Sequence, residues 1–192
     1  MIAMKMYVFV FVLSVLVAVG QSAKIDGPCP IKIKQIETFD PNRYLGKWWD
    51  VYANSYDVCS SGYGCILTYY RDYDEKLHAI DVNYYFGPDY ANICSFGIWQ
   101  TDSDVDPGLF YDGDKNSIYV LDTDYDSYAV EIACINDDGS THEERVVLRS
   151  RNFVMSDEVR DKLVKKVVDY GFAEPNLNAH NFTGCKDFTP DF

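Results

Sequence analysis

Between residues 47 and 150 the chain alternates short apolar or aromatic runs with clusters of turn residues. Runs with the composition and two-residue period of β-strands cover residues 47–54, 65–73, 77–86, 92–101, 108–112, 117–123, 127–135 and 142–150. Asp, Asn, Gly and Pro fill most of the gaps, so consecutive runs are expected to pair as antiparallel neighbours. The pattern predicts an all-β fold, an eight-stranded antiparallel up-and-down barrel that closes on itself and so has no free sheet edge.

A different period follows Asn152 and predicts one amphipathic helix. Ser156 is a suitable N-cap and is followed by two acidic residues, and Gly171 is expected to end the helix. Apolar residues recur at helical spacing at Val159, Leu163, Val164, Val167 and Val168. The helix is therefore expected over residues 157–170, packed against the outside of the barrel.

A single helical turn is expected before the first strand. Asp40 can cap it, and Pro41 suits its first position. Gly46 then permits a tight turn into the strand. If Trp48 points into the barrel, strand alternation points Tyr52 inward as well. A tryptophan at such a position is also an ordinary core residue, which needs no ligand.

The composition limits the class of protein. A chain of 192 residues with 47% hydrophobic residues fits one domain with a sizeable core. Its formal net charge is -13 and no basic stripe is present, so neither nucleic acid nor an anionic membrane is an expected partner. The 16 tyrosines suit the faces of a β-sheet and equally a ligand pocket, because each offers flat apolar area with a hydrogen-bonding tip.

Residues 1–20 are predicted to be a secretory signal peptide. Lys5 precedes an uncharged run from Met6 to Val19, and Gly20 supplies a small residue for cleavage. The run is short for a bilayer span and no later stretch reaches the required length, so membrane insertion is not expected. Residues 21–192 are then a single secreted, extracellular domain.

No catalytic or metal-binding motif stands out. The chain lacks HExxH, GxSxG and P-loop patterns, and its carboxylates form no evident facing pair, so it is not expected to be an enzyme. The three histidines are scattered and CxxC is absent, so no metal is expected. The run Asp102 to Asp106 copies the start of a calcium loop, but Pro107 and Gly113 replace the glycine and glutamate which that loop needs.

Two further features suit an extracellular protein. Six cysteines behind a signal peptide predict disulfide bonds, although the sequence alone does not choose among the pairings. Asn181, Phe182 and Thr183 form an N-glycosylation sequon, so Asn181 is expected to carry a glycan.

Three short blocks carry a resemblance to a known family. They are Gly46, Lys47 and Trp48 in a GxW pattern, then Thr123, Asp124 and Tyr125 with Tyr128, and finally residues 146–151, VVLRSR. In this order the blocks resemble those of the lipocalins, and GKWWDV is similar to insect bilin-binding proteins in particular. The resemblance implies that an arginine of the third block covers Trp48. Arg149 is taken as that residue and Arg151 is the alternative, because the block ends in Arg-Ser-Arg.

The resemblance also implies how the cysteines pair. The implied disulfides are Cys29–Cys134 and Cys65–Cys185. Cys59 and Cys94 then remain, and they either form a third disulfide or leave a free thiol.

A set of ligand-lining residues is implied in the same way. It comprises Tyr52, Tyr56, Val58, Ile66, Thr68, Tyr70, Asn83 and Tyr85. Tyr56 and Val58 belong to the loop that covers the open mouth of the barrel in lipocalins. In the strand 77–86 the hydrophobic pattern favours the opposite face, with Ile80 and Val82, and we follow the resemblance because a ligand cavity can be partly polar.

The implied function is a carrier of a small hydrophobic ligand. A closed barrel of about eight strands can enclose one such molecule. The similarity to bilin-binding proteins makes a biliverdin-type bilin the expected cofactor. The alternatives are an apolipoprotein D-like carrier of carotenoid, sterol or fatty acid, and a secreted interaction or inhibitory protein that uses the loop 55–64. The sequence leaves a homo-oligomer open.

Overall fold

The computed structural model describes residues 24–29, 36, 39–54, 65–73, 76–86, 91–101, 109–111, 117–136 and 140–187. The predicted signal peptide, residues 1–20, lies outside these ranges, as do the loop residues Tyr56 and Val58.

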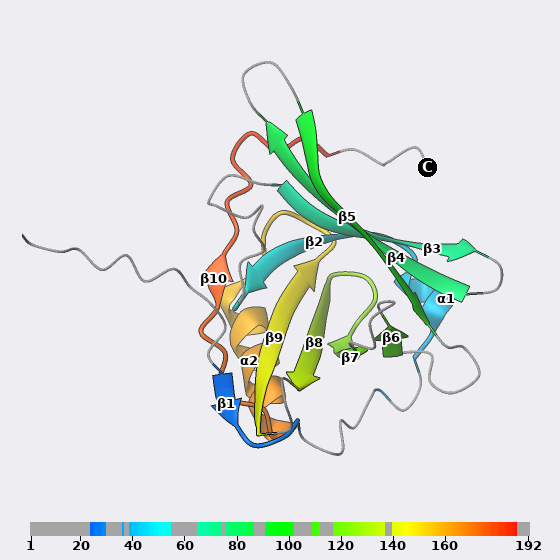
Figure 1. Ribbon diagram of the computed structural model, residues 1–192. Coiled ribbons are helices and arrows are strands. Elements are labelled where there is room, and N and C mark those ends of the chain that lie inside the picture. The colour runs from blue at the N-terminus through cyan, green and yellow to red at the C-terminus, as the bar shows by residue number, and fades with distance from the viewer. Residues whose placement is uncertain are drawn as a thin grey trace, which may run out of the picture.

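The described strands form one antiparallel sheet. They are β1 (Lys24–Asp26), β2 (Gly46–Ala53), β3 (Cys65–Tyr73), β4 (Lys76–Phe86), β5 (Ala91–Thr101), β6 (Leu109–Tyr111), β7 (Ser117–Thr123), β8 (Tyr128–Asn136), β9 (Thr141–Ser150) and β10 (Asn178–Ala179). Their order is β1-β9-β8-β7-β6-β5-β4-β3-β2-β10, and β9 also pairs with β2. This last pairing closes the eight strands from β2 to β9 into the predicted up-and-down barrel (Figure 1).

The eight predicted strands are confirmed to within one residue at each end. Two further strands, β1 and β10, were not predicted. β1 pairs with β9 beyond the stretch that β2 uses, and β10 continues the edge of β2 where β3 has ended. Two or three residues are too few to show the period of a strand, so the sequence gives no signal for β1 or β10. Both form because a free edge of β9 or β2 is available for pairing.

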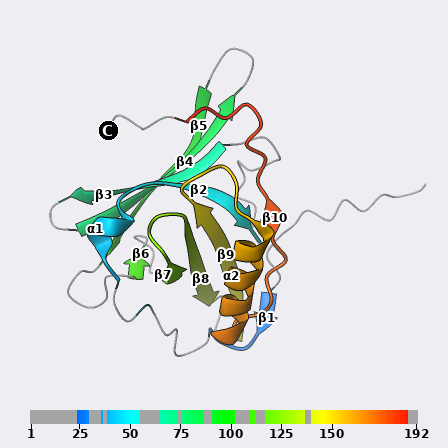
Figure 2. The ribbon, with the colours of Figure 1, turned by 180° about the vertical axis from the view of Figure 1, so that it is seen from behind.

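Two helices accompany the described sheet, and both follow the predicted capping. In α1 (Pro41–Tyr44), Asp40 Oδ1 accepts the N–H groups of Asn42 and Arg43 at 3.0 and 3.4 Å. In α2 (Asp157–Asp169), the Ser156 side chain caps the first turn, and Gly171 follows the helix with φ of 93°. Figures 1 and 2 show α2 outside the ring of strands. Neither described helix is long and apolar enough to cross a membrane.

The two adjacent tryptophans of β2 belong to different cores. Trp48 is buried against Tyr44, with ring centroids 5.0 Å apart, in a cluster that draws on α1, β3, β7 and β8 across the barrel. Trp49 packs against Phe153 and Phe182, which lie on segments outside the barrel. The outer core also includes Leu163 and Val167 of α2 and so holds the helix on the sheet. The predicted inward direction of Trp48 is confirmed.

The predicted inward direction of Tyr52 is wrong. The pairing of β2 with β9 shifts register between Asp50 and Tyr52, which is a β-bulge. Beyond the bulge the alternation changes phase, so Tyr52 packs against the outer core. Its ring centroid lies 5.7 Å from the guanidinium carbon of Arg160 in α2.

Two disulfides tie the chain ends to the barrel. Cys29 is bonded to Cys134 and Cys65 to Cys185, which confirms both implied pairings. Cys59 lies outside the described residues, and only the backbone of Cys94 is described. A third disulfide between Cys59 and Cys94 therefore stays a prediction.

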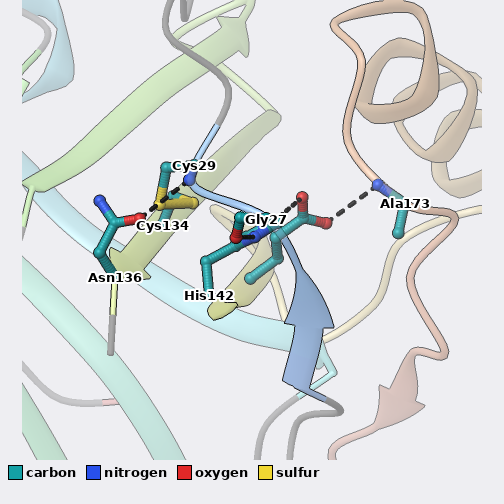
Figure 3. Close-up of a disulfide and its surroundings, with 7 residues drawn as sticks. Gly27, Cys29, Cys134, Asn136, His142 and Ala173 are labelled. Carbon is teal, nitrogen blue, oxygen red and sulfur yellow. Dashed lines mark hydrogen bonds and ion pairs between the residues drawn. A yellow bond between two sulfur atoms is a disulfide. The ribbon is translucent and has the colours of Figure 1, made fainter. Parts of the chain in front are cut away.

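A buried ion pair beside the first disulfide fastens the N-terminal segment (Figure 3). His142 Nδ1 lies 2.8 Å from the Gly27 carbonyl, and its Nε2 lies 3.1 Å from Glu144 Oε1. The other oxygen of Glu144 accepts the N–H of Ala173, just after α2. Burial alone lowers the pKa of His142, but the bonds to Gly27 and Glu144 outweigh it, so the pKa is raised. Both ring nitrogens face acceptors, which suits the protonated ring.

We expect His142→Gln to remove a stabilisation that depends on pH. A raised pKa in the folded state adds stability below the unfolded value of about 6.5, and this addition disappears as pH rises through the folded pKa. Urea unfolding should therefore show a larger loss at about pH 5 than at about pH 8. An equal loss at both values would show that His142 only fills space.

His180 fastens the C-terminal segment with the opposite pH dependence. Its backbone N–H donates to the Val51 carbonyl at 3.0 Å, and its Nδ1 lies 2.5 Å from the Asp50 carbonyl, at the bulge of β2. Its Nε2 is buried and has no hydrogen-bond partner among the described residues. Burial lowers the pKa of His180 and outweighs the bond to Asp50. A second proton would put an N–H donor where no acceptor is available.

We expect His180→Gln to make the protein more resistant to acid. Because the folded pKa is lowered, the unfolded chain takes up the proton first and wild-type stability falls below about pH 6.5. The variant should lose less stability than wild type between about pH 7 and about pH 5 in the same urea titrations. His142→Gln is the matched control, since its loss has the opposite pH dependence. A steeper loss on acidification in His180→Gln than in wild type would contradict this assignment.

Candidate functional site

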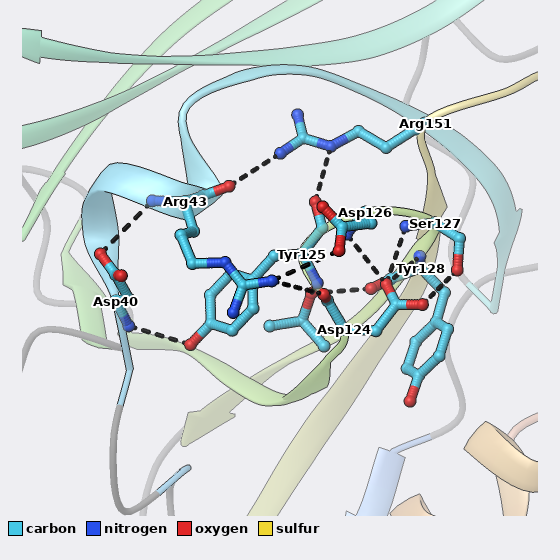
Figure 4. Close-up of polar contacts among 9 residues, drawn as sticks. Asp40, Arg43, Asp124, Tyr125, Asp126, Ser127, Tyr128 and Arg151 are labelled. Carbon is cyan, nitrogen blue, oxygen red and sulfur yellow. Dashed lines mark hydrogen bonds and ion pairs between the residues drawn. The ribbon is translucent and has the colours of Figure 1, made fainter.

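Arg151 lies over Trp48 at the end of the barrel that α1 covers. Its guanidinium carbon is 3.8 Å from the centre of the Trp48 ring. Its nitrogens donate to four backbone carbonyls, those of Arg43 at 3.1 Å, Leu45 at 3.0 Å, Lys47 at 2.9 Å and Tyr125 at 3.1 Å. The alternative residue is thus the one that covers the tryptophan, and the assignment of this role to Arg149 is wrong. Figure 4 shows Arg151 bridging two of these segments.

The second of the three short blocks, Thr123 to Tyr128, is a tight turn held by its own side chains. Asp124 Oδ1 accepts the N–H groups of Asp126, Ser127 and Tyr128 at 3.1, 2.8 and 2.9 Å. Burial raises the pKa of Asp124, but these bonds and one from the Ser127 hydroxyl outweigh it and the pKa is lowered. The turn places Tyr125, with φ of 69°, so that its hydroxyl accepts the Asp40 N–H at 2.9 Å. The turn is thereby joined to the cap of α1 (Figure 4).

We expect Arg151→Lys to destabilise the fold by about 2–3 kcal/mol, since lysine keeps the charge but cannot donate to four separated carbonyls. The midpoint of urea unfolding measures this. Arg145→Lys is the matched control. Arg145 is exposed on β9 and forms an ion pair with the nearby Glu143, and the effect of the change should stay within about 0.5 kcal/mol. Equal effects of the two variants would show that Arg151 is only a surface cation.

Arg149 points into the barrel and is the centre of a buried polar group. We call this group the interior ion cluster; it comprises Asp50, Thr68, Glu131 and Arg149, together with the hydroxyls of Tyr44 and Tyr70. Arg149 Nη1 lies 2.5 Å from Asp50 Oδ1 and also donates to the Thr68 hydroxyl. Its Nε lies 2.9 Å from Glu131 Oε2. All six residues are buried.

Two tyrosines complete the coordination of Glu131. The hydroxyls of Tyr44 and Tyr70 donate to Glu131 Oε1 at 2.6 and 2.5 Å. Burial raises the pKa of both tyrosines well above its usual value, and the Glu131 carboxylate adds to this effect. Both hydroxyls therefore keep their protons and act as donors. Among the described residues, the polar groups that contact the Glu131 carboxylate are donors, which is the environment that a carboxylate needs in a buried site.

Three of the implied ligand-lining residues share the interior face of β3. Ile66, Thr68 and Tyr70 alternate along the strand and are all buried. Thr68 and Tyr70 are engaged in the interior ion cluster, whereas Ile66 lies one alternation further from α1. The backbone register pairs Ile66 with Asn83 of β4. Ile80, favoured by the hydrophobic pattern, belongs to the outer core instead.

The remaining candidates stay predictions. The side chains of Asn83 and Tyr85 are not described, and Tyr56 and Val58 lie outside the described residues. Within the described part of the chain no group of three or more His, Cys, Asp or Glu side chains could hold a metal ion.

The sequence interpretation missed the interior ion cluster, although a signal for it exists. Glu131 is a single charge in the apolar run YAVEIACIN of β8. Strand alternation places Asp50, two residues after Trp48, on the same side as Trp48. Two acidic residues on interior faces require a buried cation, and Arg149 supplies it.

Comparison with known families and proteins agrees with this geometry. A family model described as "Lipocalin / cytosolic fatty-acid binding protein family" matches residues 104–178, which include the Thr123 to Tyr128 turn and Arg151. The bilin-binding protein of Pieris brassicae is 28% identical over 161 residues, which cover 79% of this chain and 82% of that protein.

Solved structures share the fold at lower sequence identity. Insecticyanin from the tobacco hornworm Manduca sexta superposes with a TM-score of 0.66 at 17% identity, covering 84% of this chain and 90% of its own. Lobster apocrustacyanin A1 superposes with a TM-score of 0.55 at 17% identity, covering 72% of this chain and 77% of its own. The cockroach allergen Per a 4 superposes with a TM-score of 0.60 at 15% identity, covering 83% of this chain and 99% of its own.

Proposed function

We propose that this chain, which belongs to the lipocalin family, is a secreted carrier of a small hydrophobic ligand, and that the ligand is a biliverdin-type tetrapyrrole. The observation that carries the proposal is the similarity to a bilin-binding protein over about four fifths of both chains. The two disulfides support secretion, because such bonds persist in oxidising compartments. Asn181 is exposed, as an N-glycosylation site requires, and we include its glycan in the proposal.

The number of strands in the barrel is compatible with such a ligand. An eight-stranded barrel can hold one small molecule inside. Burying about 400 Å² of apolar ligand surface contributes roughly 10 kcal/mol, against association costs of about 4 kcal/mol or more. Micromolar or tighter binding is therefore within reach without any catalytic group, and the protein acts as a carrier rather than an enzyme.

The proposed contacts lie on interior faces of β3 and β4. Ile66 lies beyond the interior ion cluster, and Asn83 is opposite it in register. Tyr85 follows Asn83 by one alternation on the same strand, and we retain Tyr56 and Val58 as residues of a covering loop. Tyr52 leaves the set, because it packs beside α2.

The test is a visible absorption spectrum of the protein from its natural source, followed by titration of the stripped protein with biliverdin. We expect red-region absorbance and saturable one-to-one binding. Tyr85→Ala should weaken this binding by about tenfold, as loss of one buried aromatic contact does. Tyr52→Ala, an equal truncation on the outer face, should leave it unchanged.

A colourless protein that ignores biliverdin would overturn the pigment assignment. Lipid extraction and mass spectrometry of the same preparation would then identify a carotenoid, sterol or fatty acid in its place.

A further inference from the structure

We propose that the interior ion cluster decides which end of a ligand can enter the barrel: it accepts an inner end that carries N–H, O–H or ammonium donors and excludes one that carries a carboxylate. This inference rests on the proposed function, since it concerns the same interior. It goes beyond that function by assigning a specificity role to Asp50, Glu131 and Arg149.

The position of the cluster makes it the inner boundary of the ligand space. Towards α1 the interior is filled by Tyr44 and Trp48, both fully buried, and by the other aromatic residues of their core. On the interior face of β3, Tyr70 reaches this aromatic end, Thr68 lies at the level of Arg149, and Ile66 lies beyond it. A ligand inside the barrel therefore lies on the Ile66 side, and its inner end meets the ion cluster.

The described residues of the cluster carry one positive and two negative formal charges. Arg149 Nη1 donates to Asp50, and the guanidinium also forms an ion pair with Glu131, so its charge is matched by two carboxylates. The formal sum is 1 − 2 = −1. A ligand carboxylate placed there would be repelled by two acidic groups, and the cation that could attract it already faces both of them.

Exposure singles out Asp50 as the member that a ligand meets. Its side chain is 12% exposed, compared with 5% for Arg149 and 2% for Glu131. A carboxylate accepts hydrogen bonds and donates none, so the group it favours on a ligand is a donor. An apolar inner end would also be unfavourable, because it would remove this carboxylate from remaining water without replacing the hydrogen bonds.

The experiment compares three twelve-carbon probes that differ only in their head group: dodecylamine, dodecanol and dodecanoate. Each is titrated below its micelle concentration and followed by tryptophan fluorescence. We expect wild-type protein to bind the amine and the alcohol at least about tenfold more tightly than the carboxylate. Equal or tighter binding of dodecanoate would overturn the proposal.

Asp50→Asn removes one charge with little change in volume. We expect it to bring dodecanoate to within about threefold of dodecanol, because the formal charge of the cluster becomes zero. Asp72→Asn is the matched control: Asp72 is an exposed carboxylate on β3, and its loss should leave the discrimination unchanged. Unchanged discrimination in Asp50→Asn would overturn the assignment.

If Asp50→Asn does not fold, the same probes are titrated against wild-type protein over a series of salt concentrations. The whole chain carries a formal charge of -13, which also repels dodecanoate, but that long-range effect is screened by salt. Discrimination by the buried cluster should persist from about 0.05 M to about 1 M salt, and its disappearance would overturn the proposal. If neither the probes nor biliverdin bind at all, the carrier function itself fails; binding without discrimination overturns only the role of the cluster.

Discussion

The interaction on which the rest of the structure depends is the contact of Arg151 with Trp48 and the backbone around it. The guanidinium covers the indole ring and donates to carbonyls of α1, of the start of β2 and of the turn before β8. α1 and the start of β2 follow each other in the chain, whereas the turn before β8 is far from both in sequence, and α1 is only four residues long. A planar cation with several fixed donors can satisfy all of them at once, which a lysine cannot. The direction of Trp48, and with it the phase of β2, follows from this contact.

The interior ion cluster poses a different physical problem. Removing three charges from water is expensive, and a buried ion pair often contributes little net stability compared with apolar residues of the same size. Arg149 therefore does not explain the stability of the barrel in the way that Arg151 does. What the cluster provides is a polar, hydrogen-bonded surface beside the aromatic and aliphatic residues that surround Trp48. Its cost is compensated by the donors that converge on Glu131, including two tyrosine hydroxyls.

The sequence predicted the elements well and their side-chain directions less well. Strand positions follow from local alternation and turn residues, so all eight barrel strands were found, but alternation holds only while the register is regular. A single extra residue at the bulge of β2 moves Tyr52 from the interior to the side that faces α2, and the local sequence pattern does not predict this bulge. The Arg-Ser-Arg run at the end of β9 contains two arginines, one on each side of Ser150 in the sequence, and either could have covered Trp48. Only the folded geometry shows that Arg151 covers Trp48 while Arg149 reaches Asp50.

The β2 bulge, which made the predicted direction of Tyr52 wrong, is also the place where β2 has contacts both inside and outside the barrel. The Asp50 carbonyl accepts from His180 on the C-terminal segment, while the Asp50 side chain is held by Arg149 inside the barrel. One residue is thus fixed from both sides, through its backbone and through its carboxylate. Because a bulge leaves backbone groups out of the regular ladder, it frees a carbonyl for such an outside donor. The C-terminal segment, tied down further by Cys65–Cys185, therefore helps to set the position of the Asp50 carboxylate inside the barrel.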